Sequence, residues 1–131
     1  MTDARSAFVC ARLNLRGAKR LLQKGSFTPG ISALYDAVLF GMHYYVTRHA
    51  SCANVDLGDA TGLFHLLTRV GVFDDHCAFN RLSLIVERAL WQGSASFDAN
   101  TLLLEVEQML TKLGVVTLIE KSEYHNKMES R

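Results

Sequence analysis

Histidine is the side chain in this sequence best suited to proton transfer or metal binding, because its pKa lies near neutral pH. His43 and His49 are six residues apart and do not share a helix face. His43 does share a face with Asp36, but seven residues of helix separate them by about 10.5 Å along the axis, too far for a direct pair. Two interpretations remain for each histidine: a hydrogen-bonded place in or beside the core, or a role as ligand or proton carrier.

Three tyrosines lie close to these histidines in the sequence: Tyr35, Tyr44 and Tyr45. Aromatic rings can stack on the bases of single-stranded RNA. They are equally suited to a protein core in which each hydroxyl group is tethered by a hydrogen bond. The spacing alone is compatible with both roles.

The sequence lacks the common motifs of self-sufficient enzymes. It has no glycine-rich phosphate loop, no H-E-x-x-H, no G-x-S-x-G and no acidic cluster with the spacing of metal ligands. Cys10, Cys52 and Cys77 are odd in number, far apart and without a C-x-x-C pair, so they predict neither a disulfide framework nor a structural zinc site. We therefore expect no metal and no cofactor, and binding is favoured over catalysis.

Positive charge is concentrated near the N-terminus, although the net charge of the whole chain is only +1. Residues 1–24 contain six arginines and lysines against the single acidic residue Asp3, a balance of +5. Arg12, Arg16 and Lys19 form a stripe about a quarter turn from the apolar seam of their helix. This stripe is either a solvated flank whose long stems cover the edge of the core, or a surface for anions or RNA.

The element that must position these side chains is an apolar helix from Thr28 to His49. Asp36 is the only charged side chain between Thr28 and Val46. Thr28 followed by Pro29 predicts the helix start, and the apolar side chains on most of its circumference predict burial. These apolar positions, at intervals of three and four, are Ile31, Ala33, Leu34, Ala37, Val38, Phe40, Gly41, Tyr44 and Tyr45.

A first helix from Asp3 to Gln23, ended by Gly25, precedes the apolar helix, and the connection is so short that the two should be antiparallel neighbours. A third, shorter helix should be capped by Asp56 or Asp59 and closed by Gly71. The expected seam of the first helix is Phe8, Ala11, Leu15, Ala18 and Leu22, and that of the third is Leu63, Phe64, Leu66, Leu67 and Val70.

A fourth helix should begin at Asp74 and Asp75, whose carboxylates complement the helix dipole, and should break at 92–94. Asp98 should cap a fifth helix that ends at Gly114, with Phe97 packed on Leu102. The fourth helix has an expected buried stripe of Phe79, Leu82, Ile85, Val86, Ala89 and Leu90, with Trp91 as an amphipathic anchor near its end. The fifth has a seam of Ala99, Leu102, Leu103, Val106, Met109, Leu110 and Leu113.

The residues after Gly114 divide into two parts. Val115 to Ile119 is short, apolar and β-branched, so it fits a docked extended tail, a short strand or a continuation of the helix. Residues 120–131 are polar and form an expected tail. We therefore predict an all-α domain over 1–119: an antiparallel up-and-down four-helix bundle with one short extra helix. The apolar helix is too short and polar for a membrane span, and no secretory leader precedes it, so we expect a cytoplasmic protein.

The order of these features resembles the HEPN (higher eukaryotes and prokaryotes nucleotide-binding) family of small antiparallel four-helix bundles. The resemblance spans Ala4 to Leu113 and implies a homodimer that binds nucleotide or RNA, or that pairs with a small nucleotidyltransferase as in bacterial toxin–antitoxin modules. The matching parts are the helix ending Ala18-Lys19-Arg20-Leu21-Leu22-Gln23-Lys24-Gly25, the tyrosine- and alanine-rich second helix, His65-Leu66-Leu67 through Gly71-Val72-Phe73-Asp74, and the helix ending Val86-Glu87-Arg88.

Members of that family that cleave RNA carry an arginine and, after four to six intervening residues, a histidine, near the end of the helix before the last long one. Arg88 falls at the matching place, but no histidine follows it between Ala89 and Ala95. Arg69 and His76 satisfy the spacing at a different element, across a glycine turn. In such chemistry the histidine would act as general acid or base and the arginine would bind the phosphate, across a dimer.

The resemblance and the missing histidine together favour a HEPN-like module that works by binding. Arg88, Arg81 and His65 are the candidate residues of an anionic nucleotide or RNA site. One alternative is a metal-independent ribonuclease that uses Arg69 and His76. Another is a structural interaction module that docks a partner through the exposed face of the first helix and the segment Val115 to Ile119.

Overall fold

The computed structural model describes residues 3–49, 56–74, 78–92 and 98–116. These residues form α-helices and contain no strand. The predictions for the loop at 50–55, for Phe97, and for residues 117–131 lie outside the described residues. The helices are α1 (Ala4–Gln23), α2 (Phe27–Arg48), α3 (Ala60–Arg69), α4 (Ala78–Gln92) and α5 (Ala99–Lys112).

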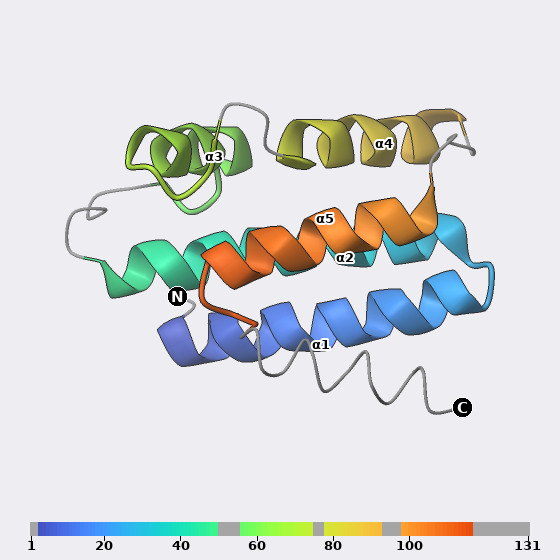
Figure 1. The fold of residues 1–131 in the computed structure, drawn as a ribbon, viewed down its shortest axis with the longest axis horizontal. Coiled ribbons are helices and arrows are strands. Elements are labelled where there is room, and N and C mark those ends of the chain that lie inside the picture. Colours follow the sequence, from blue (N-terminus) through green and yellow to red (C-terminus); the bar gives the residue numbers. More distant parts are fainter. Residues whose placement is uncertain (1–2, 50–55, 75–77, 93–97, 117–131) are drawn as a thin grey trace.

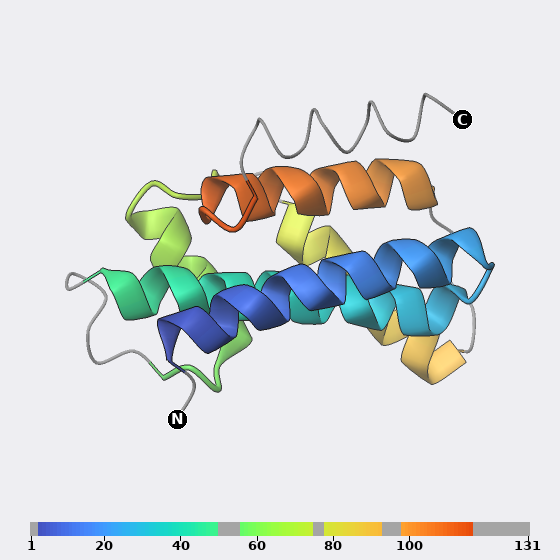
Figure 2. The same ribbon diagram turned by 90° about the horizontal axis from the view of Figure 1, so that it is seen from below.

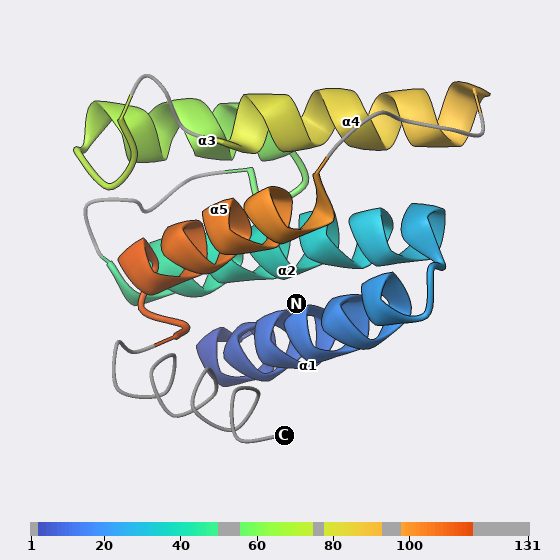
Figure 3. The ribbon, with the colours of Figure 1, turned by 45° about the vertical axis from the view of Figure 1, so that its right-hand side comes forward.

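Helix α2 lies at the centre of the bundle. It contacts each of the other four helices, and Figures 1 and 3 show it between α1 on one side and the row formed by α3 and α4 on the other, with α5 alongside. This position confirms that its nearly continuous apolar circumference is buried. Its fully enclosed side chains include Ile31, Leu34, Ala37, Val38 and Met42. No helix in the described ranges is both long enough and apolar enough to cross a membrane.

Helix α1 runs along α2 (Figure 2) and buries the small residues Ala7, Ala11 and Ala18 with Leu15. The carboxylate of Asp3 caps its start by accepting the Ser6 backbone N–H at 2.7 Å. Gly25 has a positive φ of 80°, and the Ser26 N–H donates back to the Leu21 carbonyl. The predicted seam is therefore confirmed at Ala11, Leu15 and Ala18, whereas Phe8 and Leu22 are only partly buried. The predicted glycine stop is confirmed.

The predicted start of α2 is wrong by two residues. The helix begins at Phe27 with Ser26 at the cap position, and no side chain caps it. Thr28 and Pro29 lie inside the first turn instead. The structure tolerates this because the first amides of a helix have no partner within the helix, so the missing N–H of Pro29 leaves no hydrogen bond unmade.

Helix α3 is held against α2 and α4 by aromatic side chains. The ring of Phe64 lies 5.8 Å from Phe73 and 5.1 Å from Phe79, and Phe79 lies 5.6 Å from Tyr35 of α2. Of the two caps considered, Asp59 is the one that accepts a backbone N–H of the helix, from Gly62.

The predicted start of α4 at Asp74 and Asp75 stays a prediction, because Asp75 lies outside the described residues. The described part of the helix is Ala78–Gln92. After Gly71, with φ of 89°, the N–H groups of Val72 and Phe73 both donate to the Leu67 carbonyl. This turn aims Phe73 into the core, where it is 3% exposed.

The buried stripe of α4 is confirmed at Phe79, Leu82, Ile85 and Ala89. It does not include Leu90, which is 64% exposed, and Trp91, the expected anchor, is 83% exposed. Both residues lie past Ala89 on the side of the helix turned away from α2. Their placement leaves a large apolar surface uncovered by the described residues.

Helix α5 follows its predicted boundaries. Asp98 caps it by accepting the Asn100 and Thr101 N–H groups, and Gly114 ends it with a φ of 84°. Gly41 of α2 lets the two helices approach closely, because a Cβ there would lie 2.9 Å from Leu110 and 3.0 Å from Leu113. Val115 is neither helix nor strand, and it is 1% exposed. Residues 117–119 lie outside the described residues, so the docking role of the segment Val115 to Ile119 stays a prediction.

The stripe predicted on α1 is not a uniform solvated flank. Arg16 is exposed, but Lys19 is buried, and its Nζ lies 3.5 Å from Oε2 of Glu107 on α5. The two side chains are 10% and 4% exposed. This buried ion pair joins two helices that are far apart in sequence, and nothing in the helical spacing of either one indicates the other.

Removing one member of this ion pair should destabilise the protein far more than removing both. We expect Lys19→Met to lower the free energy of unfolding by about 3 kcal/mol, because it leaves Glu107 buried without its cation. The double variant Lys19→Met/Glu107→Leu should regain most of that loss. Urea unfolding would measure both, with the exposed Lys24→Met as control. Equal losses in the single and double variants would contradict a coupled pair.

Candidate functional site

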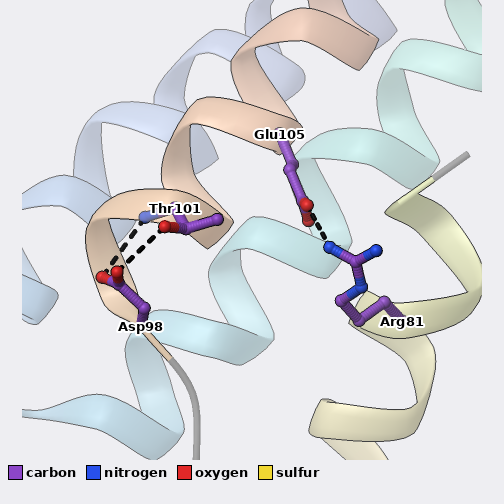
Figure 4. A network of polar contacts seen from close by, with 4 residues as sticks. All are labelled: Arg81, Asp98, Thr101 and Glu105. Atoms are coloured by element: carbon purple, nitrogen blue, oxygen red, sulfur yellow. Dashed lines mark hydrogen bonds and ion pairs between the residues drawn. The ribbon is translucent and has the colours of Figure 1, made fainter.

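The two candidate arginines of α4, Arg81 and Arg88, are seven residues apart and share a face of the helix. Arg81 forms an ion pair with Glu105 of α5 (Figure 4). The Arg81 side chain is 60% exposed, so the pair contributes little to stability. Arg88 is exposed and forms no ion pair within the described residues, although the equally exposed Glu87 is its neighbour in sequence.

Helix α5 and its cap contribute carboxylates to this side of the bundle. Asp98, at the start of α5, accepts the Thr101 hydroxyl at 2.9 Å (Figure 4) and the Asn100 N–H at 3.0 Å. The hydrogen bonds from Thr101 hold the pKa of Asp98 below its usual value, so it is ionised at neutral pH. Glu105 and Asp98 thus place negative charge along the α4–α5 face, which weakens that face as a site for a polyanion.

The other predicted site residues do not gather around Arg88. His65 and Arg69 are exposed on α3, and Figures 1 and 3 show α3 and α4 arranged end to end. The contact between the rings of Phe64 and Phe79 places α3 beside the first turn of α4. Arg88 is nine residues beyond Phe79, about 14 Å further along the axis. His76 lies outside the described residues, so the pair of Arg69 and His76 stays a prediction.

The outward face of α1 presents a different arrangement of charge. Arg5, Arg16 and Arg20 are exposed on the side opposite the buried seam, with Val9 and Leu13 between them. The helix contains no acidic residue, and none of these three arginines takes part in an ion pair within the described ranges. We call Arg5, Arg16 and Arg20 the α1 basic face. The charge of residues 1–24 predicted a basic surface here, but the stripe predicted from the sequence was Arg12, Arg16 and Lys19.

Two arginines beside the α1 basic face are stacked on aromatic rings. The guanidinium carbon of Arg12 lies 5.4 Å from the centre of the Phe8 ring, and that of Arg48 lies 5.0 Å from the Tyr44 ring. The Phe8 and Tyr44 rings are themselves 5.1 Å apart across the α1–α2 contact. The sequence could have predicted both stacked pairs, because each arginine follows its aromatic residue by four positions on a helix.

The two histidines of α2 have local partners. His43 Nε2–H donates to the Leu57 carbonyl at 2.8 Å, which ties α2 to the residues before α3. His49 stacks on Tyr45 with ring centres 3.9 Å apart, and its Nδ1–H donates to the Tyr45 carbonyl at 2.7 Å. Within the described residues no group of three or more histidine, cysteine or acidic side chains could hold a metal ion.

Protonation of His43 is disfavoured in the folded protein. Because Nε2 carries the proton donated to Leu57, the second proton would sit on Nδ1, which is buried without a hydrogen-bond partner among the described residues. Burial lowers the pKa of His43 below its ordinary value of 6.5, and the bond to Leu57 offsets only part of that effect. The unfolded chain therefore binds this proton at a higher pH than the folded chain does.

The free energy of unfolding should thus be fully retained above about pH 6.5 and should fall as the pH drops from there toward the lower pKa of the folded state. His43→Gln, which keeps a donor for Leu57 but cannot be protonated, should flatten this decline. Urea unfolding at several pH values would measure it, with the exposed His65→Gln as control. An unchanged pH slope in His43→Gln would contradict the role of His43.

Comparisons of the chain with models of protein families, with curated proteins and with solved structures each found no match. The resemblance to the HEPN family therefore rests on the residues that suggested it. Function has to be inferred from the charge and exposure of the surfaces.

Proposed function

We propose that this protein is an RNA-binding helical module without catalytic activity, and that the α1 basic face is its binding surface. The observation that carries the proposal is the presence of three exposed arginines on one face of a helix that contains no acidic residue. Phosphate groups dominate the affinity of proteins for nucleic acids, and exposed arginines supply the charge and the hydrogen-bond donors that phosphates need.

The electrostatic contrast between the two outer layers supports this choice. On the α4–α5 face, Arg81 is paired with Glu105 and the capping carboxylate of Asp98 is ionised. Just before α1, the carboxylate of Asp3 already accepts the Ser6 N–H, and the carboxylate of Glu107 is paired with the buried Lys19. From Arg5 to Arg20 the α1 basic face extends about 22 Å along the helix axis, enough to follow several phosphates of an extended strand.

The stacked arginines extend this positive surface toward α2. Arg12 over Phe8 and Arg48 over Tyr44 are held by their rings, so their guanidinium groups lose less conformational freedom when they bind. Phe8 and Tyr44 are only half-exposed and pack on each other. Their role in the proposal is to orient arginines, with phosphates rather than bases as the ligand groups.

A membrane surface is a weaker fit for the same face. A helix that lies in a lipid interface needs a broad apolar side to insert. The apolar side of α1 is already buried in the core, where Ala7, Ala11 and Ala18 are fully enclosed. The exposed apolar residues between the arginines are Val9 and Leu13. The face should therefore bind mainly through its positive charge.

The HEPN resemblance adds further proposals: antiparallel helices, a homodimer, and either RNA or a small nucleotidyltransferase as partner. The short connection between α1 and α2, residues 24–26, supports the antiparallel arrangement. The absence of a histidine after Arg88 supports binding without cleavage. We keep the nucleotidyltransferase as a possible partner of the proposed module and RNA as its ligand.

Removing charge from the α1 basic face should weaken RNA binding. We expect Arg16→Gln/Arg20→Gln to raise the Kd for a fluorescein-labelled single-stranded RNA about tenfold at moderate salt, because two phosphate contacts are lost. The logarithm of the association constant decreases with the logarithm of the salt concentration, and this negative slope should become less steep by about 1.4, at about 0.7 for each lost contact with a single strand. Fluorescence anisotropy over a range of salt concentrations would measure both quantities.

The matched variant Arg88→Gln/Lys112→Gln removes the same number of positive charges from exposed positions on α4 and α5. It should leave the salt slope nearly unchanged. A larger loss of RNA affinity in this variant than in Arg16→Gln/Arg20→Gln would indicate that the binding site includes Arg88. Failure of the unmodified protein to bind RNA would overturn the proposed function.

A further inference from the structure

The two edges of the outward surface of α1 differ in charge. An α-helix turns by about 100° per residue, so Arg5, Arg12 and Arg16 fall within about 40° of one another around the axis. We call these three residues the arginine flank. The opposite edge of the helix consists of uncharged residues, namely Ser6, Cys10, Asn14, Gly17 and Leu21. The arginines of α1 therefore leave one of its two edges without charge.

Helix α2 adds a further arginine on the charged side. Arg48 stacks on Tyr44, and the Tyr44 ring lies 5.1 Å from the ring of Phe8 on α1. Phe8 is also the ring on which Arg12 of the arginine flank is stacked. Arg48 thus extends the charge of the arginine flank and not the uncharged edge.

Two exposed apolar side chains run beside the arginine flank. Val9 is 45% exposed and Leu13 is 56% exposed, and they follow one another on successive turns about 6 Å apart along the axis. Arg12 comes three positions after Val9, and Arg16 comes three positions after Leu13, so each arginine is the neighbour of an apolar side chain. We call Val9 and Leu13 the apolar row. Single exposed apolar residues are common on proteins, whereas this register with the arginines makes two parallel rows of different chemistry.

Paired and unpaired strands present phosphates and bases to a protein in different ways. In a duplex the bases are stacked inside, and a helix that docks in a groove has a row of phosphates on each side of it. An unpaired strand has one row of phosphates, and its bases can be splayed out so that their faces lie on the protein. One row of cations beside one row of apolar side chains matches the unpaired strand.

Double-stranded RNA fits this surface poorly. Its major groove is too deep and narrow for side chains to read, and its minor groove displays 2′-hydroxyl groups, to which Val9 and Leu13 have no hydrogen bond to offer. The second row of phosphates would meet the uncharged edge of α1. We infer that the α1 basic face binds unpaired RNA, with the phosphates along the arginine flank and the bases against the apolar row.

This inference rests on the proposed function and names the state of the strand that the α1 basic face selects. Apolar contacts with the faces of bases do not read the hydrogen-bonding edges, so binding should depend little on sequence. The two rows also differ in their response to salt, because only contacts with phosphates release counterions. The contribution of the apolar row can therefore be measured separately from that of the arginines.

Fluorescence anisotropy with a labelled, unstructured RNA of about 12 nucleotides, alone and annealed to its complement, provides the test. The unmodified protein should bind the unpaired strand at least about fivefold more tightly than the duplex. Val9→Ser/Leu13→Ser should remove most of this preference by weakening binding of the unpaired strand about fivefold, with an unchanged salt slope because no cation is lost. Competition by inorganic polyphosphate, which has phosphates but no bases, should report the same polyphosphate affinity for both proteins.

The matched control is Leu84→Ser/Leu104→Ser, which makes the same kind of change at exposed leucines of α4 and α5. It should leave both RNA affinities unchanged, and circular dichroism would confirm that each variant is folded. Absence of binding to either form of RNA would overturn the proposed function itself. Binding of the duplex as tightly as the unpaired strand would overturn only the inference made here, as would a Val9→Ser/Leu13→Ser variant that keeps the full preference.

Discussion

The burial of α2 is the constraint on which the rest of the structure depends. A helix that is apolar on most of its circumference is stable in water only when other helices cover all of its sides. Helix α1 covers one side, α5 another, and α3 with α4 the remainder. The small residues of the α1 seam and Gly41 of α2 allow this close approach. The surrounding helices then use one face each for the core, and their opposite faces become the surface of the protein.

The two outermost layers present different chemistry. The α1 basic face consists of arginines on a helix that contains no acidic residue, and this favours a polyanionic ligand. The outer side of α4 combines the exposed apolar residues Leu84 and Trp91 with one charge of each sign, Glu87 and Arg88. Because α2 lies between α1 and α4, the two surfaces do not compete for space.

Local signals in the sequence were enough to predict the helices, whereas contacts between distant helices were not. Asp59, Asp98 and the glycines at 25, 71 and 114 marked ends that the structure confirms. The partnership of Lys19 with Glu107 could not be predicted, because helical periodicity contains no information about which helix lies opposite. The exposure of Trp91 was missed for a related reason: size and apolarity suggest burial, but only packing shows which side of α4 faces the core.

The contact between α1 and α2 is the most extensive of the helix–helix contacts in the described residues, and these helices are neighbours in the chain. Bringing them together closes a very short loop, which costs little chain entropy compared with joining α1 to α5. Contacts between segments that are close in sequence also speed folding. During synthesis on the ribosome, the α1–α2 hairpin emerges before α3, α4 and α5, so the most apolar helix of the protein has a partner from the outset.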